Sequence, residues 1–231
     1  PAGMYAALRC IELGFKPIVL ERGKNVQDRR RDLKAINQDH FVNEDSNYCF
    51  GEGGAGTYSD GKLYTRSHKR GNIQGVLEVL VAHGADPDIL VEAHPHIGTN
   101  KLPGIIESMR ETILQCGGEV RFKSYFKDVE LDEDGRIETI DYEELGSGKM
   151  NRVRATDVVL ATGHSARDIF RWMHSRNWSI EAKPFAMGVR VEHSQEWVDK
   201  VQYHGAKQAG EVDAILPPAA YRLVCQSDGR G

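Results

Sequence analysis

The N-terminal segment constrains the fold more than any other part of the chain. Apolar side chains recur at helical spacing over residues 3–13, and Gly14 follows where a helix end favours glycine. Residues 16–21, Lys-Pro-Ile-Val-Leu-Glu, form a short apolar run that predicts a buried strand ending in an acid. This order of helix, glycine and buried strand is typical of the second half of a βαβ unit, so the sequence predicts an α/β fold with a parallel sheet.

The same segment fits part of the dinucleotide-binding fingerprint G-x-G-x-x-G. Pro1, Ala2 and Gly3 match its last three positions, and Gly3 would let the helix pack closely on a strand. The N–H groups at the helix start would attract a pyrophosphate. Glu21 lies 18 residues after Gly3, close to the spacing of the acid that accepts the ribose hydroxyls, and its carboxylate disfavours NADP. The alternative is an ordinary αβ unit with Glu21 at the surface.

Residues 51–63 contain too much glycine for a regular helix or strand. The glycines free the backbone to approach a planar ring or a phosphate. The segment has no G-x-x-x-x-G-K-[ST] sequence, because Leu63 follows Gly61 and Lys62, so ATP hydrolysis is disfavoured. Polar groups follow the glycines at Thr57, Ser59, Asp60 and Lys62.

Apolar periodicity in the remaining chain predicts two helices, a three-stranded β-meander and two further strands. Residues 24–39 are polar and basic, and the Arg29-Arg30-Arg31 run is interpreted mainly as a solvated helix face, with phosphate contact as the alternative. The helices are expected over residues 73–83 and 104–116, the meander over 119–123, 127–131 and 136–142 with a turn at 132–135, and the further strands over 158–161 and 187–191, leaving 85–104 as a structured loop.

Composition excludes several classes of protein. The formal net charge of -4 argues against a general polyanion binder, so we expect no nucleic-acid partner. No apolar run reaches the about 18 residues of a membrane span. Cys10, Cys49, Cys116 and Cys225 form no C-x-x-C pair, which disfavours a disulfide framework and favours a reducing cytoplasm. Because the chain begins at Pro1 inside an expected helix, we expect it to be a piece of a longer protein.

In consistent order, blocks of this sequence resemble the FAD-dependent oxidoreductases of the glutathione-reductase-like superfamily, and most of all a family of FAD-dependent, or NAD(FAD)-utilising, dehydrogenases. The resemblance implies a Rossmann-like FAD-binding domain with a parallel sheet and a three-strand β-meander, and the start of a second, substrate domain. The blocks are residues 1–3, 19–23, 51–63, 96–99, 161–166 and 183–190. The implied domains are residues 1–66 with 104–172 for FAD, 67–103 as an excursion, and 173–231 for substrate.

The resemblance also implies roles for individual residues. Gly3 would lie by the FAD pyrophosphate, Glu21 would hold the adenosine ribose, and Arg22 would flank the adenosine. Phe126, at the start of the middle meander strand, would meet the adenine through its backbone. The glycine-rich segment would lie along the isoalloxazine, with Lys62 near flavin N1–C2=O to stabilise the anionic reduced ring. The complete expected set is Gly3, Glu21, Arg22, Gly53, Gly54, Ala55, Gly56, Thr57, Ser59, Asp60, Lys62, Phe126, Thr162 and Gly163.

The expected chemistry is a two-electron redox reaction in which FAD moves a hydride through N5, to or from a small organic substrate, with NADH or NADPH as candidate electron donor. The sequence identifies no catalytic acid or base. It also indicates no metal site, since His94 and His96 have no cysteine or carboxylate cluster beside them. The alternatives are a non-catalytic dinucleotide-binding or sensor module, and a flavoenzyme that acts on RNA.

Overall fold

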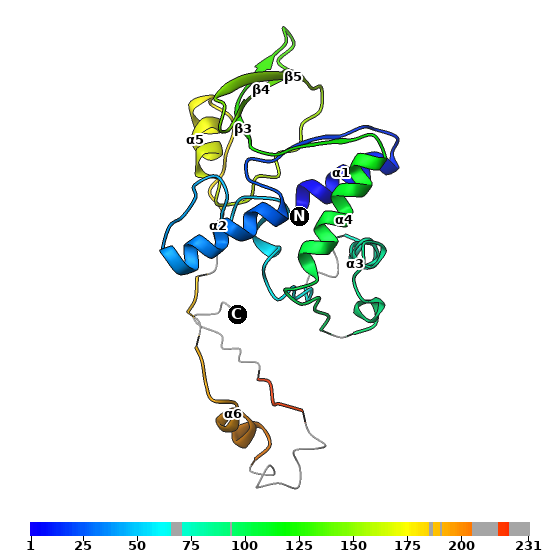
Figure 1. Ribbon diagram of the computed structural model, residues 1–231, viewed down its shortest axis with the longest axis vertical. Coiled ribbons are helices and arrows are strands. Elements are labelled where there is room, and N and C mark those ends of the chain that lie inside the picture. Colours follow the sequence, from blue (N-terminus) through cyan, green and yellow to red (C-terminus); the bar gives the residue numbers. More distant parts are fainter. Residues whose placement is uncertain (66–70, 93, 185–186, 190, 205–216, 222–231) are drawn as a thin grey trace. The chain divides into compact units, whose positions relative to one another are not determined.

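The structure is a computed structural model that describes residues 1–65, 71–92, 94–184, 187–189, 191–204 and 217–221 (Figure 1). The chain divides into two compact units, Pro1–Ser179 and Ile180–Gly231. In the first unit the chain forms a mixed α/β structure with one parallel and one antiparallel sheet. Phe185, Ala186 and Arg190, which fall in the block at 183–190, and Cys225 lie outside the described residues.

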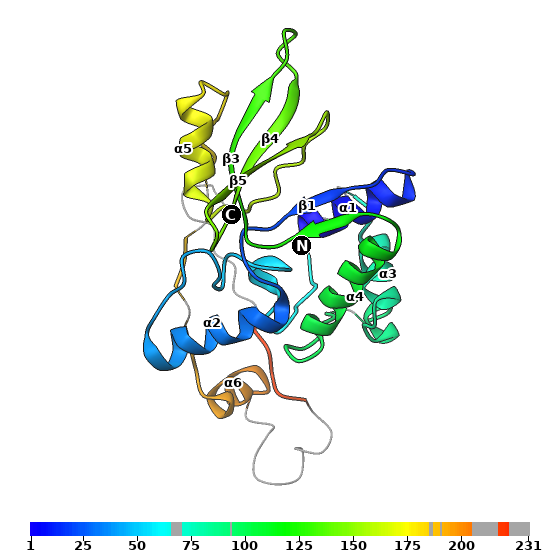
Figure 2. The same ribbon diagram turned by 45° about the horizontal axis from the view of Figure 1, so that its top comes forward.

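The parallel sheet pairs β1 (Ile18–Leu20) with β2 (Glu119–Arg121). Helices α1 (Ala2–Glu12), α3 (Ile73–Ala82) and α4 (Leu102–Gln115) supply most of one buried apolar core beside this sheet (Figure 2). The predicted helices over 3–13, 73–83 and 104–116 are therefore confirmed. The predicted strand over 16–21 is present, but it is only partly buried, with Ile18 40% exposed.

Glycine ends the first helix as the sequence predicts. Gly14 has φ +84, the left-handed conformation that glycine adopts without a steric penalty. Its N–H donates to the carbonyl of Ile11 at 2.9 Å, and the N–H of Phe15 donates to that of Cys10 at 2.9 Å. This pair of bonds is the Schellman arrangement, and it directs the chain from α1 into β1.

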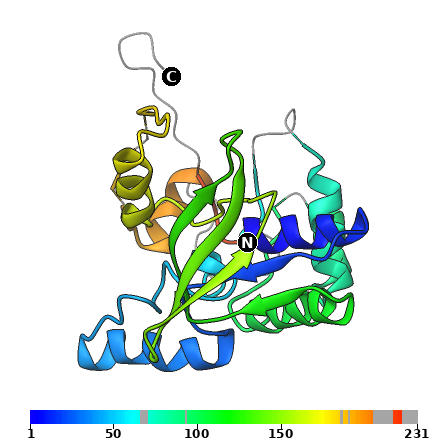
Figure 3. The ribbon, with the colours of Figure 1, turned by 90° about the horizontal axis from the view of Figure 1, so that it is seen from above.

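The antiparallel sheet has the strand order β3–β4–β5, formed by Ser124–Leu131, Ile137–Glu144 and Lys149–Arg154 (Figure 3). The turn at 132–135 is confirmed, with Gly135 at φ +77. The prediction that residues 119–123 belong to the meander is wrong, because β2 pairs in parallel with β1 and the third meander strand is β5. Lys123 at φ +54 separates β2 from β3. The sequence pattern predicts a strand at 119–123 but does not show which strand it pairs with. Phe126 therefore lies on an edge strand of the meander, not on its middle strand.

The predicted strands over 158–161 and 187–191 are absent from the described residues. Val159 is 67% exposed and Leu160 42% exposed. A fully apolar strand is stable where neighbouring strands and covering helices bury it, and in the part of the chain that the structure describes the parallel sheet contains only β1 and β2. An apolar run with no strand to pair with stays irregular.

Two more helices complete the first unit. α2 (Val26–Asp39) follows β1, and the side chain of Asn25 caps it by accepting a hydrogen bond from the Asp28 N–H. α5 (Arg167–Ser175) packs beside β3, where the Trp172 and Phe126 rings meet edge to face at 4.8 Å. Short 3₁₀ turns occupy Gly54–Gly56 and Pro87–Leu90.

The second unit has one described helix, α6 (Gln195–Gln202). Ser194 caps it by accepting from the Trp197 N–H, and Asp199 Oδ1 accepts from the Ala219 N–H at 2.7 Å. Among the described helices of the chain, none is long and apolar enough to cross a membrane.

Candidate functional site

The N-terminus of α1 presents backbone N–H groups. The first hydrogen bond of the helix runs from the Tyr5 N–H to the Pro1 carbonyl at 3.1 Å, and no side chain caps the start. The N–H groups of the first turn carry a partial positive charge that favours an anion. A Cβ on Gly3 would lie 3.4 Å from the Cβ of Ala161. The helix start and the Ala161-Thr162-Gly163 segment, far apart in sequence, are thus neighbours.

Glu21 follows β1 directly, and two backbone N–H groups hold its carboxylate. Its Oε1 atom accepts from the Gly23 N–H at 2.7 Å and from the Gly51 N–H at 3.1 Å. A Cβ on Gly23 would lie 2.5 Å from the Gly51 Cα atom, so the two backbones touch and Gly23 tolerates no side chain. The end of β1 and the start of the glycine-rich segment therefore form one structural element around this carboxylate.

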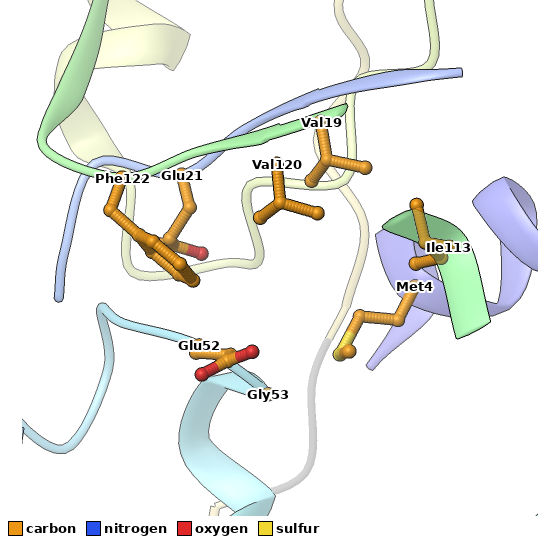
Figure 4. A pocket seen from close by; sticks show the side chains of 8 residues that line it. All are labelled: Met4, Val19, Glu21, Glu52, Gly53, Ile113, Val120 and Phe122. Atoms are coloured by element: carbon orange, nitrogen blue, oxygen red, sulfur yellow. The ribbon is translucent and has the colours of Figure 1, made fainter. Parts of the chain in front are cut away.

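A cavity of about 30 Å³ lies beneath this element. Figure 4 shows the Glu21 and Glu52 carboxylates with the Phe122 ring at one end, and Met4 and Ile113 at the other. The volume suits one water molecule and is far too small for a nucleotide. A nucleotide would therefore have to bind outside this cavity. The lining residues are Met4, Val19, Glu21, Glu52, Gly53, Ile113, Val120 and Phe122.

Glu52 is a buried carboxylate, with a side chain 3% exposed. It accepts from the Val26 N–H at 2.8 Å and from Arg110 Nη1 at 3.0 and 2.8 Å. Burial raises the pKa of Glu52, while the Val26 hydrogen bond and the Arg110 charge act in the opposite direction. Arg110 also pairs with Glu107 at 2.9 Å, so Glu52 joins the glycine-rich segment to both α2 and α4.

Arg29 is completely buried, so the interpretation of residues 29–31 as a solvated face is wrong for this member of the run. Arg30 and Arg31 are exposed, as that interpretation expects. Burial lowers the pKa of Arg29. The buried positions of α2 are Val26, Arg29 and Leu33, which recur at helical spacing. This spacing is the signal in the sequence that could have identified Arg29 as an inward-facing residue.

The glycine-rich segment turns sharply through left-handed backbone. Gly51, Gly53, Gly54 and Gly61 have φ values of +122, +76, +69 and +68. A Cβ on Gly53 would lie 2.2 Å from the Thr57 Oγ1 atom. That hydroxyl is buried and donates to the Glu52 carbonyl at 3.0 Å. Thr57 therefore stabilises the turn from within.

The later part of the segment is more exposed. Ala55, Gly56, Ser59 and Asp60 face solvent, and the Ser59 hydroxyl donates to the Gly56 carbonyl at 2.7 Å. Lys62 pairs with Asp60 at 3.0 Å, with side chains 78% and 58% exposed. The hydrogen bond from Lys62 lowers the pKa of Asp60. A cation for a flavin ring is thus present on the surface, but it is already paired.

Arg22 is held by two carboxylates and two rings. Its Nε donates to Asp45 at 2.7 Å and its Nη1 to Asp168 at 3.0 Å. The guanidinium lies 4.4 Å from the centre of the Tyr125 ring and 4.9 Å from that of Phe50. The pair with Asp168 ties the start of α5 to the end of β1, a partnership across 146 residues that local patterns cannot indicate.

The remaining expected residues lie near the start of α1 or on the meander. Thr162 and Gly163 are exposed, and Gly163 has φ +75 with open space where a Cβ would be. The Phe126 ring packs on Trp172, whose indole N–H donates to Asp128 at 2.9 Å. Gly3, Glu21 and the Gly53–Gly54 turn are brought together, since Gly53 lines the cavity with Glu21 and a Cβ on Gly54 would lie 3.0 Å from the ring of Pro1.

Comparison with known families bears on the second unit. Residues 184–231 match a family described as "FAD-dependent protein, C-terminal domain-like". This match supports FAD as the cofactor and leaves the glutathione-reductase-like assignment a prediction.

Comparison with individual proteins adds little about function. The chain is 40% identical over 228 residues to a Clostridium beijerinckii protein named "Uncharacterized protein", covering 99% of this chain and 40% of the relative. The chain therefore spans well under half the length of that relative. A solved 3-ketosteroid-Δ4-(5α)-dehydrogenase from Rhodococcus jostii RHA1, in complex with 4-androstene-3,17-dione, shows 14% identity over 67% of this chain and 42% of the dehydrogenase, with a TM-score of 0.38. Similarity at this level supports no argument.

Proposed function

We propose that the first unit is a Rossmann-like FAD-binding unit and that the protein is an FAD-dependent oxidoreductase. One observation carries the proposal. The Glu21 carboxylate, at the end of a parallel strand, is oriented by the Gly23 and Gly51 N–H groups in the same corner as the uncapped start of α1. A carboxylate and a helix N-terminus so arranged suit the ribose and pyrophosphate of a dinucleotide. The family match over residues 184–231 supports FAD as that dinucleotide.

The residues present fit such a cofactor. Oε1 of Glu21 takes both backbone N–H groups, which leaves Oε2 for a ribose hydroxyl. Gly3 presents no side chain at the helix start, and Gly56 and Gly163 have open space where a Cβ would lie. These positions allow close approach of a pyrophosphate and a ring system. When bound, FAD would supply hydride transfer through its N5 atom.

For the other residues we propose the roles that the family resemblance implies. Arg22, already paired with Asp45 and Asp168, would flank the adenosine without offering a free charge to a 2′-phosphate. Lys62 would exchange its surface pair with Asp60 for the flavin N1–C2=O edge. Phe126, on β3, would present its backbone to the adenine. Ala55, Thr57 and Ser59 would support the glycine-rich segment, and Thr162 and Gly163 would lie beside the cofactor.

The substrate in this proposal is a small organic molecule that exchanges a hydride with the flavin, and NADH or NADPH is the proposed electron donor. We propose a cytoplasmic site of action, as the cysteine pattern favours. The chain alone assigns no catalytic acid or base.

Titration of FAD into the chain tests the proposal. Uptake should quench flavin fluorescence with a stoichiometry of one, and Glu21→Gln should weaken the affinity about tenfold or more, because a charge-assisted hydrogen bond to the ribose is lost. Glu133→Gln is the matched control, since Glu133 is exposed in the turn after β3. Equal affinity of both variants would contradict the role of Glu21. Bound flavin that neither NADH nor NADPH reduces would favour the sensor alternative.

A further inference from the structure

The buried guanidinium of Arg29 binds the backbone of the segment that leads into the glycine turn. Its Nε donates to the Asn47 carbonyl at 2.9 Å, its Nη2 to that of Tyr48 at 3.0 Å, and its Nη1 to that of Glu52 at 2.8 Å. Three carbonyl oxygens from two sides of one loop thus converge on one planar cation. A lysine ammonium, a point charge on a flexible stem, does not reproduce this fork.

The aliphatic part of the same side chain lies against Gly51. A Cβ on Gly51 would come within 2.5 Å of the Arg29 Cδ and 2.8 Å of its Nε. Gly51 also has φ +122, so both the space and the backbone conformation require glycine at this position. The N–H of this same residue holds Oε1 of Glu21 at 3.1 Å. One peptide therefore lies between the buried arginine and the carboxylate proposed to bind the ribose.

No carboxylate accepts a hydrogen bond from Arg29 among the described residues. Every acceptor of its hydrogen bonds is a carbonyl or the Thr57 hydroxyl, and its charge interacts with the Glu21 and Glu52 carboxylates from beyond hydrogen-bond contact. A fully buried cation is costly unless its donors are satisfied. Because the Arg29 guanidinium donates to the backbone of one loop, it favours a single conformation of that loop.

We propose that Arg29 is a positioning residue for the nucleotide site. It fixes the conformation of residues 47–57 and, through the Gly51 N–H, the orientation of the Glu21 carboxylate, without touching any ligand. The consequence for ligand affinity rests on the proposed function; the consequence for the loop does not.

The test compares Arg29→Lys with Arg30→Lys, which makes the same change on the exposed neighbour in the same helix. Amide hydrogen exchange of Gly23 and Gly51 is measured without FAD, under conditions where each variant is folded. Arg29→Lys should accelerate exchange at these two amides by about tenfold or more, because fewer hydrogen bonds hold the loop. It should weaken FAD affinity by about tenfold to a hundredfold, the range found when groups that orient metal ligands are removed. Arg30→Lys should leave both at the wild-type values.

A second variant keeps the inference testable if Arg29→Lys does not fold. Gly51→Ala retains the guanidinium and displaces it through the added Cβ, so it should produce the same faster exchange at Gly23 and the same loss of FAD affinity. Unchanged exchange and affinity in a folded variant, with only the melting temperature lowered, would show a merely structural role and overturn the inference. If the wild-type chain binds no FAD, the proposed function fails, and the exchange comparison still decides the role of Arg29.

Discussion

The sequence predicts that the glycine-rich segment and the Thr162–Gly163 end of the apolar segment border one cofactor. The glycine turn at 51–57 and residues 158–163 nevertheless differ in burial and in hydrogen bonding. Residues 51–53 and Thr57 are buried, and Arg29 and Thr57 both donate to the Glu52 carbonyl. The Glu52 carboxylate joins the turn to α2 and α4. Residues 159–163 are exposed and adopt no regular structure. The Gly3 position shows that the second segment nevertheless passes beside the start of α1.

Composition alone therefore does not decide which of the two segments is buried. Residues 51–57 have no large apolar side chain, but two charged residues, Arg29 and Glu21, bind their backbone. The Val-Val-Leu-Ala run has apolar side chains but, in the described residues, no strand that pairs with its backbone. Satisfaction of backbone hydrogen bonds, more than hydrophobicity, separates the two segments.

The largest effect is expected when the buried charge pair under the glycine turn is broken. Arg110→Met leaves the Glu52 carboxylate, 3% exposed, without its charged partner and should lower the free energy of unfolding by about 3–5 kcal/mol. Arg9→Met removes one partner of the exposed Arg9–Glu12 pair and should cost less than about 1 kcal/mol. Urea denaturation of both variants measures the difference; similar losses would mean that the turn does not depend on buried charge.

Alanine at matched glycines sharpens the comparison directly. Gly53→Ala combines φ +76 with a Cβ only 2.2 Å from Thr57 Oγ1, so it should destabilise the protein by about 2–5 kcal/mol. Gly163→Ala has nearly the same φ, +75, but open space, and should cost only the backbone term of about 1–2 kcal/mol. Thermal or chemical unfolding gives both values, and the reverse order would contradict the packing of the glycine turn.

The two regions also show which features of the fold are predictable from the sequence. The first helix, its glycine end, and the acid after β1 were predictable because periodicity, Gly14 and Glu21 are local features. β5 was missed because Lys149–Arg154 is polar and its identity as a strand depends on pairing with β4. The run at 158–161 was assigned as a strand because hydrophobicity does not show whether a partner strand exists.

The site followed the same rule. The position of Glu21 was predictable from spacing. One of the two N–H groups that orient its carboxylate belongs to Gly51, 30 residues away, which spacing does not indicate. Arg22 was expected near adenosine, but its pairing with Asp168 depends on the packing of α5. Arg29 is buried although the two arginines that follow it are exposed, so the charge run as a whole did not indicate its burial. Long-range partners, which no local pattern contains, decide what each charged group can do.

The pH dependence of stability should distinguish the buried carboxylate of Glu52 from the exposed carboxylate of Glu133. Because the pKa of Glu52 is raised in the folded chain above its ordinary 4.5, the folded state holds this proton more tightly than the unfolded state does. Its contribution to the free energy of unfolding should therefore fall as the pH rises from about 4.5 through the raised value. Urea unfolding over a pH series should show this decline in the wild type and lose it in Glu52→Gln; Glu133→Gln should retain it. An unchanged slope in Glu52→Gln would contradict the assignment.

The smallest effect is expected in the exposed segment. Val159→Ser removes an apolar side chain that is 67% exposed, so the free energy of unfolding should change by no more than about 0.5 kcal/mol. Chemical denaturation measures this change, and Ile113→Ala in the core, at about 2–5 kcal/mol, sets the scale. A loss for Val159→Ser close to that of Ile113→Ala would show that residues 158–161 are buried as the original strand prediction required.

We propose that the α1 start, Glu21 and the glycine turn together bind FAD. The measurement to make first is the visible absorption spectrum of the chain after equilibration with FAD and removal of free ligand. We expect a flavin spectrum at one FAD per chain, with weaker flavin absorbance in Glu21→Gln. A folded, colourless protein would contradict it and would leave Gly3, Glu21 and the glycine turn as parts of an α/β scaffold alone.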